Sequence, residues 1–247
     1  DPFGANGDFI TSPEISQMFG ELLGLCLAQN WIDQGMKPFA LVEAGPGRGT
    51  LMIDILHATK LIPEFHQNMT IHLIEESIEL QKIQKEKLSG FRAQWHTSIH
   101  TIPNKAPYFI ANEFFDALPI RQFKRAAKCW EEILIGEKNG KLVFYLGNKI
   151  PLYSIPHHIE NTKIGDVVET CIAAKPIIAV LSDRIKNYGG CAIIVDYGDD
   201  DLVGNTFQAV KNHKKINTLK LPGDSDLTAH VDFKELTRDI SEIMVTK

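Results

Sequence analysis

Residues 41–50, Leu-Val-Glu-Ala-Gly-Pro-Gly-Arg-Gly-Thr, place three glycines within five positions directly behind a short apolar run. Glycines let a ligand approach the backbone closely, and a helix that follows them offers free N–H groups at its first turn. Leu51, Ile55 and Ala58 fall on one helical face, so such a helix is predicted after Thr50. Strand, glycine loop and helix together form a cradle for a nucleotide-type ligand.

Apolar runs and amphipathic segments alternate along the rest of the chain. An amphipathic helix is predicted from Ser12, with Ser12 as N-cap and Pro13 at its first position. Strands are predicted at Phe39–Val42, 70–75, 93–97, 107–113 and 191–198, with helices at 50–58, 77–88 and about 167–187. This order is typical of an α/β fold with a doubly wound, mostly parallel sheet, which binds ligands at the carboxyl ends of its strands.

One segment interrupts the alternation. Asn139-Gly140 lies between two apolar runs and predicts a β-hairpin insertion over residues 129–150. With no repeat and no low-complexity linker, we interpret 1–247 as a single domain. Its expected parts are a helical lead-in (1–36), a core (37–128), the insertion, and a continuation of the core (151–247). The start without methionine and the lack of clear strands in the last 50 residues suggest that N- and C-terminal parts are missing.

The overall composition excludes several classes of function. A net charge of −5 and scattered lysines give no grip for nucleic acid. The four cysteines form no C-x-x-C pair, so neither a metal site nor a disulfide framework is expected, and a reducing compartment fits best. No apolar run approaches the roughly 20 residues of a membrane span.

The spacing of the glycines limits the classes of ligand that the loop can bind. A dinucleotide loop would need a third small residue at position 50, where the chain has Thr50, and no Gly-Lys-Ser/Thr follows as in a phosphate P-loop. Gly45, Gly47 and Gly49, with Glu43 two residues upstream, favour the phosphate-free cofactor S-adenosylmethionine (SAM). Glu43 would lie near the ammonium group of SAM.

The second predicted strand ends in Glu75-Glu76. A carboxylate at that place can accept hydrogen bonds from both ribose hydroxyls of an adenosine, and Glu75 is the better candidate because it directly follows the strand. The alternative is structural: the glycines would only make a tight turn, and Glu75 would be an exposed acid at a helix start.

Polar residues also follow the fourth strand, where they would face the donor methyl group. Asn112 is assigned to the cofactor site, and Glu113 and Asp116 are candidate catalytic residues. If the acceptor is a guanidinium, carboxylates can hold its planar fork in two places and offset charge while a proton leaves. The alternative is that Asp116 caps a turn before Pro119 and that Glu113 faces water.

Further candidates lie elsewhere in the chain. His230 is a candidate base because its ordinary pKa lies near neutrality, although a histidine beside a helix start is often structural. Asp232 is the expected N-cap of that helix. Asp196 and Tyr197 are expected at the pocket rim. Glu14 either supports its helix dipole or folds over the ligand with the lead-in.

Several sequence blocks resemble the MidA-like methyltransferases. They are "GDFITSPEISQMFGELLG", "EAGPGRGTLMIDIL", "HLIEESIELQKIQ", "IANEFFDALPIRQF", "IIVDYG" and "PGDSDLTAHVDFKEL", in order from Gly7 to Leu236. By this resemblance the SAM loop falls on Glu43–Gly49, the second-strand acid on Glu75 and the loop after the fourth strand on Asn112–Pro119. Departures are the missing ends and Ala44, where a larger apolar residue is common.

The resemblance implies a Rossmann-like class I methyltransferase fold, with helices on both faces of the sheet, and SAM as cofactor. The family includes a mitochondrial assembly factor that methylates an arginine on a subunit of NADH:ubiquinone oxidoreductase, so symmetric protein-arginine dimethylation is the implied activity. A protein substrate, no nucleic acid and no membrane span are expected. A homodimer is one expected assembly state, and the location is the bacterial cytoplasm, or the mitochondrial matrix in a eukaryote.

The sequence also allows a second hypothesis about function. The protein would be a non-catalytic assembly chaperone that holds its partner through the hairpin and through exposed aromatics such as Phe114 and Phe115. A small-molecule or nucleic-acid methyltransferase is a weaker alternative, since the chain has Asn-Glu-Phe-Phe where amino-methylating nucleic-acid enzymes have Asn-Pro-Pro-aromatic.

Overall fold

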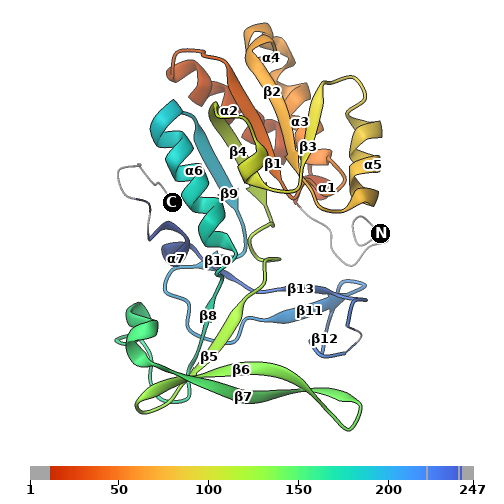
Figure 1. Cartoon of the computed structure of the whole chain (residues 1–247). Helices are drawn as coiled ribbons and strands as arrows, with labels where there is room; N and C mark the ends of the chain where they lie inside the picture. Colours follow the sequence, from red (N-terminus) through yellow and green to blue (C-terminus); the bar gives the residue numbers. More distant parts are fainter. Residues whose placement is uncertain (1–11, 221, 239, 241–247) are drawn as a thin grey trace.

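A five-stranded parallel sheet forms the upper half of the molecule (Figure 1). The computed structural model describes residues 12–220, 222–238 and 240. Strand order is β3-β2-β1-β4-β9, with every neighbouring pair parallel. The strands are β1 (Phe39–Ala44), β2 (Met69–Ile74), β3 (Ala93–His96), β4 (Ala106–Asn112) and β9 (Cys191–Val195). The predicted α/β fold with a parallel sheet is confirmed.

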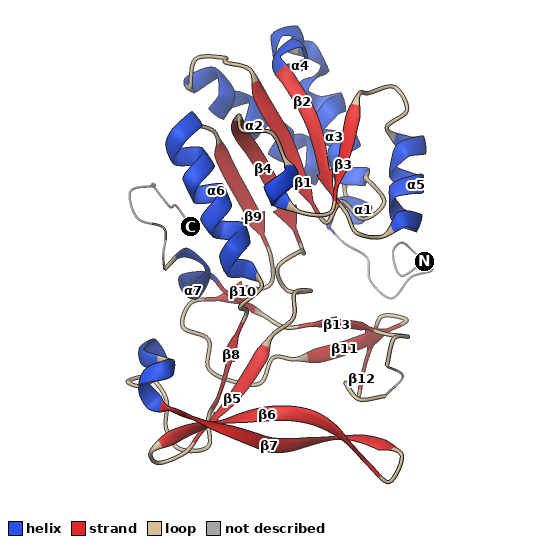
Figure 2. Cartoon of the chain, viewed as in Figure 1, coloured by secondary structure: helices blue, strands red, loops and turns tan. Residues whose placement is uncertain are grey.

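Strand β1 lies at the centre of this sheet and is buried along its whole length. Because side chains alternate across a strand, Phe39 and Leu41 enter one core cluster, whereas Ala40 and Val42 enter the other. Helices cover both faces of the sheet, as Figure 2 shows. They are α2 (Gln17–Asp33), α3 (Thr50–Ala58), α4 (Pro63–Asn68), α5 (Ile78–Lys87) and α6 (Ala174–Tyr188), joined by the short turns η1 (Thr59–Leu61) and η2 (Ile99–Thr101).

The lead-in differs from its prediction. Instead of one helix from Ser12, a short α1 (Ser12–Ile15) precedes α2, and Ser16 between them has an extended backbone with φ −146°. Ser12 therefore lies within α1. The break changes the direction of the chain, so that α1 reaches the loop after β4 while α2 packs on the sheet. The part of the lead-in before Ser12 lies outside the described residues.

A four-stranded antiparallel sheet, order β7-β6-β5-β8, forms the lower part of the molecule (Figure 2). Its strands are β5 (Arg121–Arg125), β6 (Cys129–Lys138), β7 (Lys141–Pro151) and β8 (Val167–Thr170), followed after β7 by the turns η3 (Leu152–Ser154) and η4 (Pro156–His158). The hairpin predicted at Asn139-Gly140 is confirmed, and both residues have positive φ, 54° and 73°, as a tight hairpin turn requires.

This sheet extends beyond the predicted hairpin. Strand β5 pairs with both β6 and β8, so the antiparallel structure runs from Arg121 to Thr170 rather than over 129–150 alone. The predicted start of the long helix, at about Val167, was wrong. Helix α6 begins at Ala174, because Val167–Thr170 forms strand β8 and pairs with β5, which is distant in sequence. Phe123, Trp130 and Val168 give this sheet a small core of its own.

The last third of the chain also contains strands that the sequence did not predict. They are β10 (Gly198–Asp199), β11 (Gln208–Lys211), β12 (Lys214–Ile216), β13 (Asp226–Thr228) and β14 (Val231–Asp232), followed by helix α7 (Phe233–Thr237). Each is short, and the turn between β11 and β12 is made by Asn212 and His213, both at positive φ and neither a glycine. Brevity and unusual turn residues explain why the pattern gave no strand signal.

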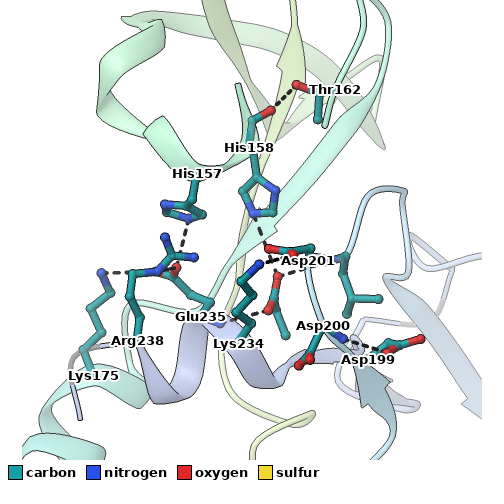
Figure 3. A network of polar contacts seen from close by, with 12 residues as sticks. His157, His158, Thr162, Lys175, Asp199, Asp200, Asp201, Lys234, Glu235 and Arg238 are labelled. Carbon is teal, nitrogen blue, oxygen red and sulfur yellow. Dashed lines mark hydrogen bonds and ion pairs between the residues drawn. The ribbon is translucent and has the colours of Figure 1, made fainter. Parts of the chain in front are cut away.

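A network of polar contacts joins α7 to the segment after β7 (Figure 3). His157 contacts Glu235 at 2.9 Å, and Lys175 and Arg238 contact the same carboxylate at 3.3 and 2.9 Å. Asp232 accepts a hydrogen bond from the Glu235 amide at 2.9 Å, so its predicted role as helix N-cap is confirmed. The network thereby ties the antiparallel part of the chain to the end of the described structure.

Two further observations concern the described residues only. No helix among them is long and apolar enough to span a membrane. No group of histidine, cysteine and acidic side chains in the described ranges is arranged to hold a metal ion, and the four cysteines are free.

Candidate active site

A cavity of about 190 Å³ lies at the carboxyl ends of β1, β2 and β4. It brings together most residues predicted for the cofactor site. Those that line it are Glu43, Gly45, Gly47, Glu75 and Asn112, together with the candidate catalytic residue Glu113. Further lining comes from Pro13, Glu14, Pro46, Arg48, Thr50, Leu51, Leu80, Phe114 and Ala117. We call it the donor pocket. Gly49, Asp116 and His230 do not line it.

The glycine loop needs its glycines for two different reasons. A Cβ on Gly45, whose φ is 64°, would stand 2.8 Å from the Phe114 ring, so any side chain there would force the ring to move. Gly47 has φ 51°, and a Cβ there would meet no described atom within 4 Å. Gly47 also lines the donor pocket. Gly49 lies behind it as the N-cap of α3.

Glu43 and Asn112 present buried acceptors to the donor pocket. Their side chains are 2% and 8% exposed, and neither Glu43 Oε2 nor Asn112 Oδ1 has a hydrogen-bond partner among the described residues. Burial raises the pKa of Glu43 to about 8, against a smaller lowering by Lys87. Buried acceptors without partners are costly, so the pair fits a ligand that brings donors and positive charge, such as an ammonium group.

Glu75 is held at the pocket by its neighbours. Its Oε1 accepts a hydrogen bond from the Ser77 amide at 2.8 Å, and its Oε2 accepts one from the Gln84 side chain at 3.2 Å. Gln84 also donates to the Gly47 carbonyl at 2.7 Å and accepts from Trp95 at 2.8 Å. One fully buried amide therefore fixes the acid and the glycine loop relative to each other.

Sequence reasoning missed Gln84. A signal existed, because Leu80, Gln84 and Leu88 follow helical spacing and Gln84 is a polar residue on that apolar face.

The lead-in closes one side of the donor pocket. The Ser12 amide donates to Glu113 Oε1 at 3.2 Å, and the Thr50 hydroxyl donates to Glu14 Oε1 at 2.6 Å. Pro13 and Glu14 both line the cavity. Glu14 therefore lies both in the first turn of α1 and beside the ligand space, so both interpretations from the sequence stay open.

The loop after β4 carries the candidate catalytic carboxylates. Glu113 has φ 49°, a left-handed conformation that is strained for a residue with a side chain and is concentrated at functional sites. Asp116 is 8% exposed, and burial, followed by the nearby Asp196 and Glu113, raises its pKa to about 7. Asp196 itself accepts hydrogen bonds from the Phe115 and Asp116 amides at 2.9 and 3.2 Å. It anchors this loop and is absent from the residues that line the donor pocket.

Three expectations from the sequence need correction. Phe115 is 3% exposed, because it packs into the core beneath the sheet, so the prediction of an exposed aromatic was wrong there. His230 lines a separate cavity with Cys171 and Glu235, and its amide donates to the Thr206 hydroxyl at 2.8 Å. The structure does not bring His230 together with the other candidates. Tyr197 is 60% exposed and is also absent from the donor pocket's lining.

Known proteins are similar to this chain in sequence and in fold. The family described as "Putative S-adenosyl-L-methionine-dependent methyltransferase" matches residues 22–246. Protein arginine methyltransferase NDUFAF7, mitochondrial, of Danio rerio is 39% identical over 265 residues, covering 96% of this chain and 63% of that protein. Its Homo sapiens counterpart is 38% identical over 267 residues, covering 96% and 60%. The chain thus spans about three fifths of these relatives' length.

Among solved structures, a Burkholderia thailandensis protein bound to S-adenosyl-homocysteine superposes with a TM-score of 0.81 at 24% identity, covering 96% of this chain and 64% of that one. This likeness confirms the predicted fold. The family match confirms the resemblance seen in the sequence blocks and names SAM as the family's cofactor. The chain belongs to the S-adenosyl-L-methionine-dependent methyltransferase family that this match defines.

Proposed function

We propose that this protein methylates an arginine side chain of a partner protein, with SAM as the methyl donor. The observation that carries the proposal is the pairing of two sets of groups. Buried acceptors without partners, Glu43 and Asn112, line the donor pocket, and the carboxylates Glu113 and Asp116 follow on the loop beside it. Relatives at 38–39% identity are named protein arginine methyltransferases, which supports the same acceptor class here.

The residues have separate roles in this proposal. Glu43 would hold the ammonium group of SAM, Glu75 the ribose hydroxyls, and the backbone at Gly45, Gly47 and Gly49 would leave room for the ligand. Asn112 would accept a hydrogen bond through its buried Oδ1. When bound, SAM supplies an electrophilic methyl group.

Glu113 and Asp116 would hold the acceptor guanidinium and orient one of its nitrogens. The pKa of Asp116, raised to about 7, suits a group that takes up the proton the guanidinium must lose. Because His230 lines a different cavity, we assign the role of base to Asp116.

The finer points of the proposal concern the product, the substrate and the location. From the resemblance of the sequence blocks we propose symmetric dimethylation, with a subunit of NADH:ubiquinone oxidoreductase as substrate. We propose action in the mitochondrial matrix because the relatives are named mitochondrial. For a bacterial source the corresponding location is the cytoplasm. A homodimer stays a prediction.

Methyl transfer from radiolabelled SAM to the respiratory-complex subunit tests the proposal. Glu113→Gln and Asp116→Asn should each lower kcat at least tenfold while S-adenosyl-homocysteine still binds in isothermal titration. Glu76→Gln, an exposed acid outside the pocket, is the matched control and should behave as the wild type. Undiminished transfer by both carboxylate variants would refute the assigned roles.

The second candidate is an assembly chaperone without catalysis. Exposed apolar side chains on the β6–β7 hairpin, including Ile135 and Phe144 at 49% and 43%, favour a partner surface there. Gly47→Val would fill the open space at the donor pocket and abolish SAM binding. Assembly of the partner complex that survives this substitution would favour the chaperone, whereas its loss would favour the enzyme.

A further inference from the structure

A second and larger cavity, of about 340 Å³, adjoins the donor pocket. The two cavities share Ala117, on the loop that carries Glu113 and Asp116. The loop after β4, the antiparallel sheet and the later strands surround it, with the lining residues Asp116, Ala117, Leu118, Pro119, Ile120, Gln122, Ile133, Ile135, Phe144, Phe207, Leu227, Thr228 and Ala229. We call it the groove. None of these residues has a role in holding SAM.

One side of the groove is an apolar face of the β6–β7 hairpin. Ile135 pairs directly with Phe144 across the two strands, so their side chains share a face, and they are 49% and 43% exposed. Phe207, directly before β11, and Leu227 on β13, which is 43% exposed, contribute apolar side chains from the later strands. Large apolar residues from distant segments that gather around one open cavity mark a binding surface.

An acidic residue lines the groove directly beside Ala117, which the groove shares with the donor pocket. This residue is Asp116, and Glu113 and Asp196 are close enough to raise the pKa of its carboxyl. Gln122 also lines the groove, and its amide donates to Glu169 and Asn205 at 2.7 and 2.8 Å. An acid that lines an apolar groove complements a ligand that carries a cation beside an apolar group.

We propose that the groove binds the segment of the substrate protein that carries the acceptor arginine. The guanidinium lies against Asp116, and a neighbouring apolar side chain of the same segment lies between the Ile135–Phe144 pair and Leu227. This inference rests on the proposed function and adds a preference to it: the acceptor arginine is flanked by a large apolar residue. Charge complementarity and the shared Ala117 favour this occupant over a second copy of the chain.

Fluorescence anisotropy with labelled peptides tests the preference on the full chain saturated with S-adenosyl-homocysteine. The probes are decapeptides with one central arginine among serines, in which a phenylalanine is moved through the other positions. The best phenylalanine peptide should bind roughly tenfold more tightly than the all-serine parent, as a single well-seated aromatic residue does. Replacing its arginine by uncharged citrulline should weaken binding by a similar factor.

Two adjacent residues of β7 make the matched pair of variants. Phe144→Ser should abolish the phenylalanine preference, whereas Tyr145→Ser should keep it, because Tyr145 is 48% exposed but points to the opposite face of the strand. Unchanged S-adenosyl-homocysteine binding shows that both variants fold. Equal affinity for all peptides, or an unchanged preference in Phe144→Ser, would overturn the inference.

Two other readouts separate the alternatives. A wild type that prefers the phenylalanine peptide but methylates no peptide would refute the proposed function and leave the groove assignment intact. A wild type that methylates the peptides without any preference would support the proposed function and refute the groove assignment. In sedimentation velocity, a dimer that Phe144→Ser dissociates and Tyr145→Ser does not would make the groove a contact between copies, and the inference would be wrong.

Discussion

Replacing Glu43 by glutamine tests how the donor pocket selects its ligand. The carboxyl is buried and its pKa is raised to about 8, so at pH 7 about nine tenths of the unliganded molecules carry a neutral Glu43. An ammonium group placed beside it favours the ionised form. Binding of SAM or S-adenosyl-homocysteine at pH 7 should therefore release close to one proton, and Glu43→Gln should release none.

The raised pKa of Glu43 also sets how the affinity for S-adenosyl-homocysteine depends on pH. If only the ionised form binds well, the binding-competent fraction rises from about 1% at pH 6 to about a quarter at pH 7.5, so affinity should rise roughly twentyfold. Glu43→Gln should bind more weakly at pH 7.5 and show a flat profile between the two pH values. Without ligand, the variant should be more stable than the wild type at pH 7 by roughly 3 kcal/mol, because it does not have to take up a proton on folding.

Isothermal titration with S-adenosyl-homocysteine in two buffers of different ionisation enthalpy measures the proton release directly. Asp54→Asn is the matched control, since Asp54 is another buried acid with a raised pKa that does not line the pocket. Asp54 also contributes a small part of the rise in the pKa of Glu43, so the control should keep most of the proton release. No release by the wild type, or equal release by Glu43→Gln, would refute the assignment of Glu43 to the ammonium group.

Three further predictions test other parts of the structure. Glu75→Gln should weaken S-adenosyl-homocysteine binding about tenfold, and its exposed neighbour Glu76→Gln should not; equal titration curves would disprove the ribose assignment. Gly45→Ala should cost about 3 kcal/mol in urea unfolding, and Gly47→Ala about 1 kcal/mol, because only the first adds a clash, at 2.8 Å from Phe114, to the strain of positive φ. Equal costs would contradict this reading of the loop. Burial lowers the pKa of His72 to about 4, so the free energy of unfolding should fall by about 2–3 kcal/mol between pH 6.5 and pH 4.5, as the unfolded chain takes up a proton that the folded one does not. His72→Gln should remove that part of the pH dependence, and a slope identical to the wild type's would count against it.

Local patterns predicted the parts of the fold that depend on nearby residues. The buried run of β1, the glycine loop and the Asn139-Gly140 turn each carry their signal within a few positions. Strand β8 was missed because its partner β5 lies more than forty residues earlier, and its apolar residues merge with those that lead into α6. The break at Ser16 was missed for a related reason, since it follows from contacts of Ser12 with Glu113.

The candidate site shows the same division. Glu43, Glu75 and Asn112 were predictable because the ends of parallel strands meet at one edge of a sheet. Gln84 and Asp196 were not identified as supports, because their hydrogen bonds join residues 37 and 81 positions apart, Gln84 to Gly47 and Phe115 to Asp196. His230 was grouped with the site on its chemistry alone, and its location in another cavity depended on the late strands that the sequence did not predict.

Tandem mass spectrometry can detect methylation of the proposed substrate, a subunit of NADH:ubiquinone oxidoreductase, after its incubation with this protein and SAM. We expect two methyl groups on a single arginine, one on each terminal nitrogen, and their loss when Asp116→Asn replaces the wild type. A wild type that binds S-adenosyl-homocysteine normally but leaves every arginine of that subunit unmodified would contradict this expectation.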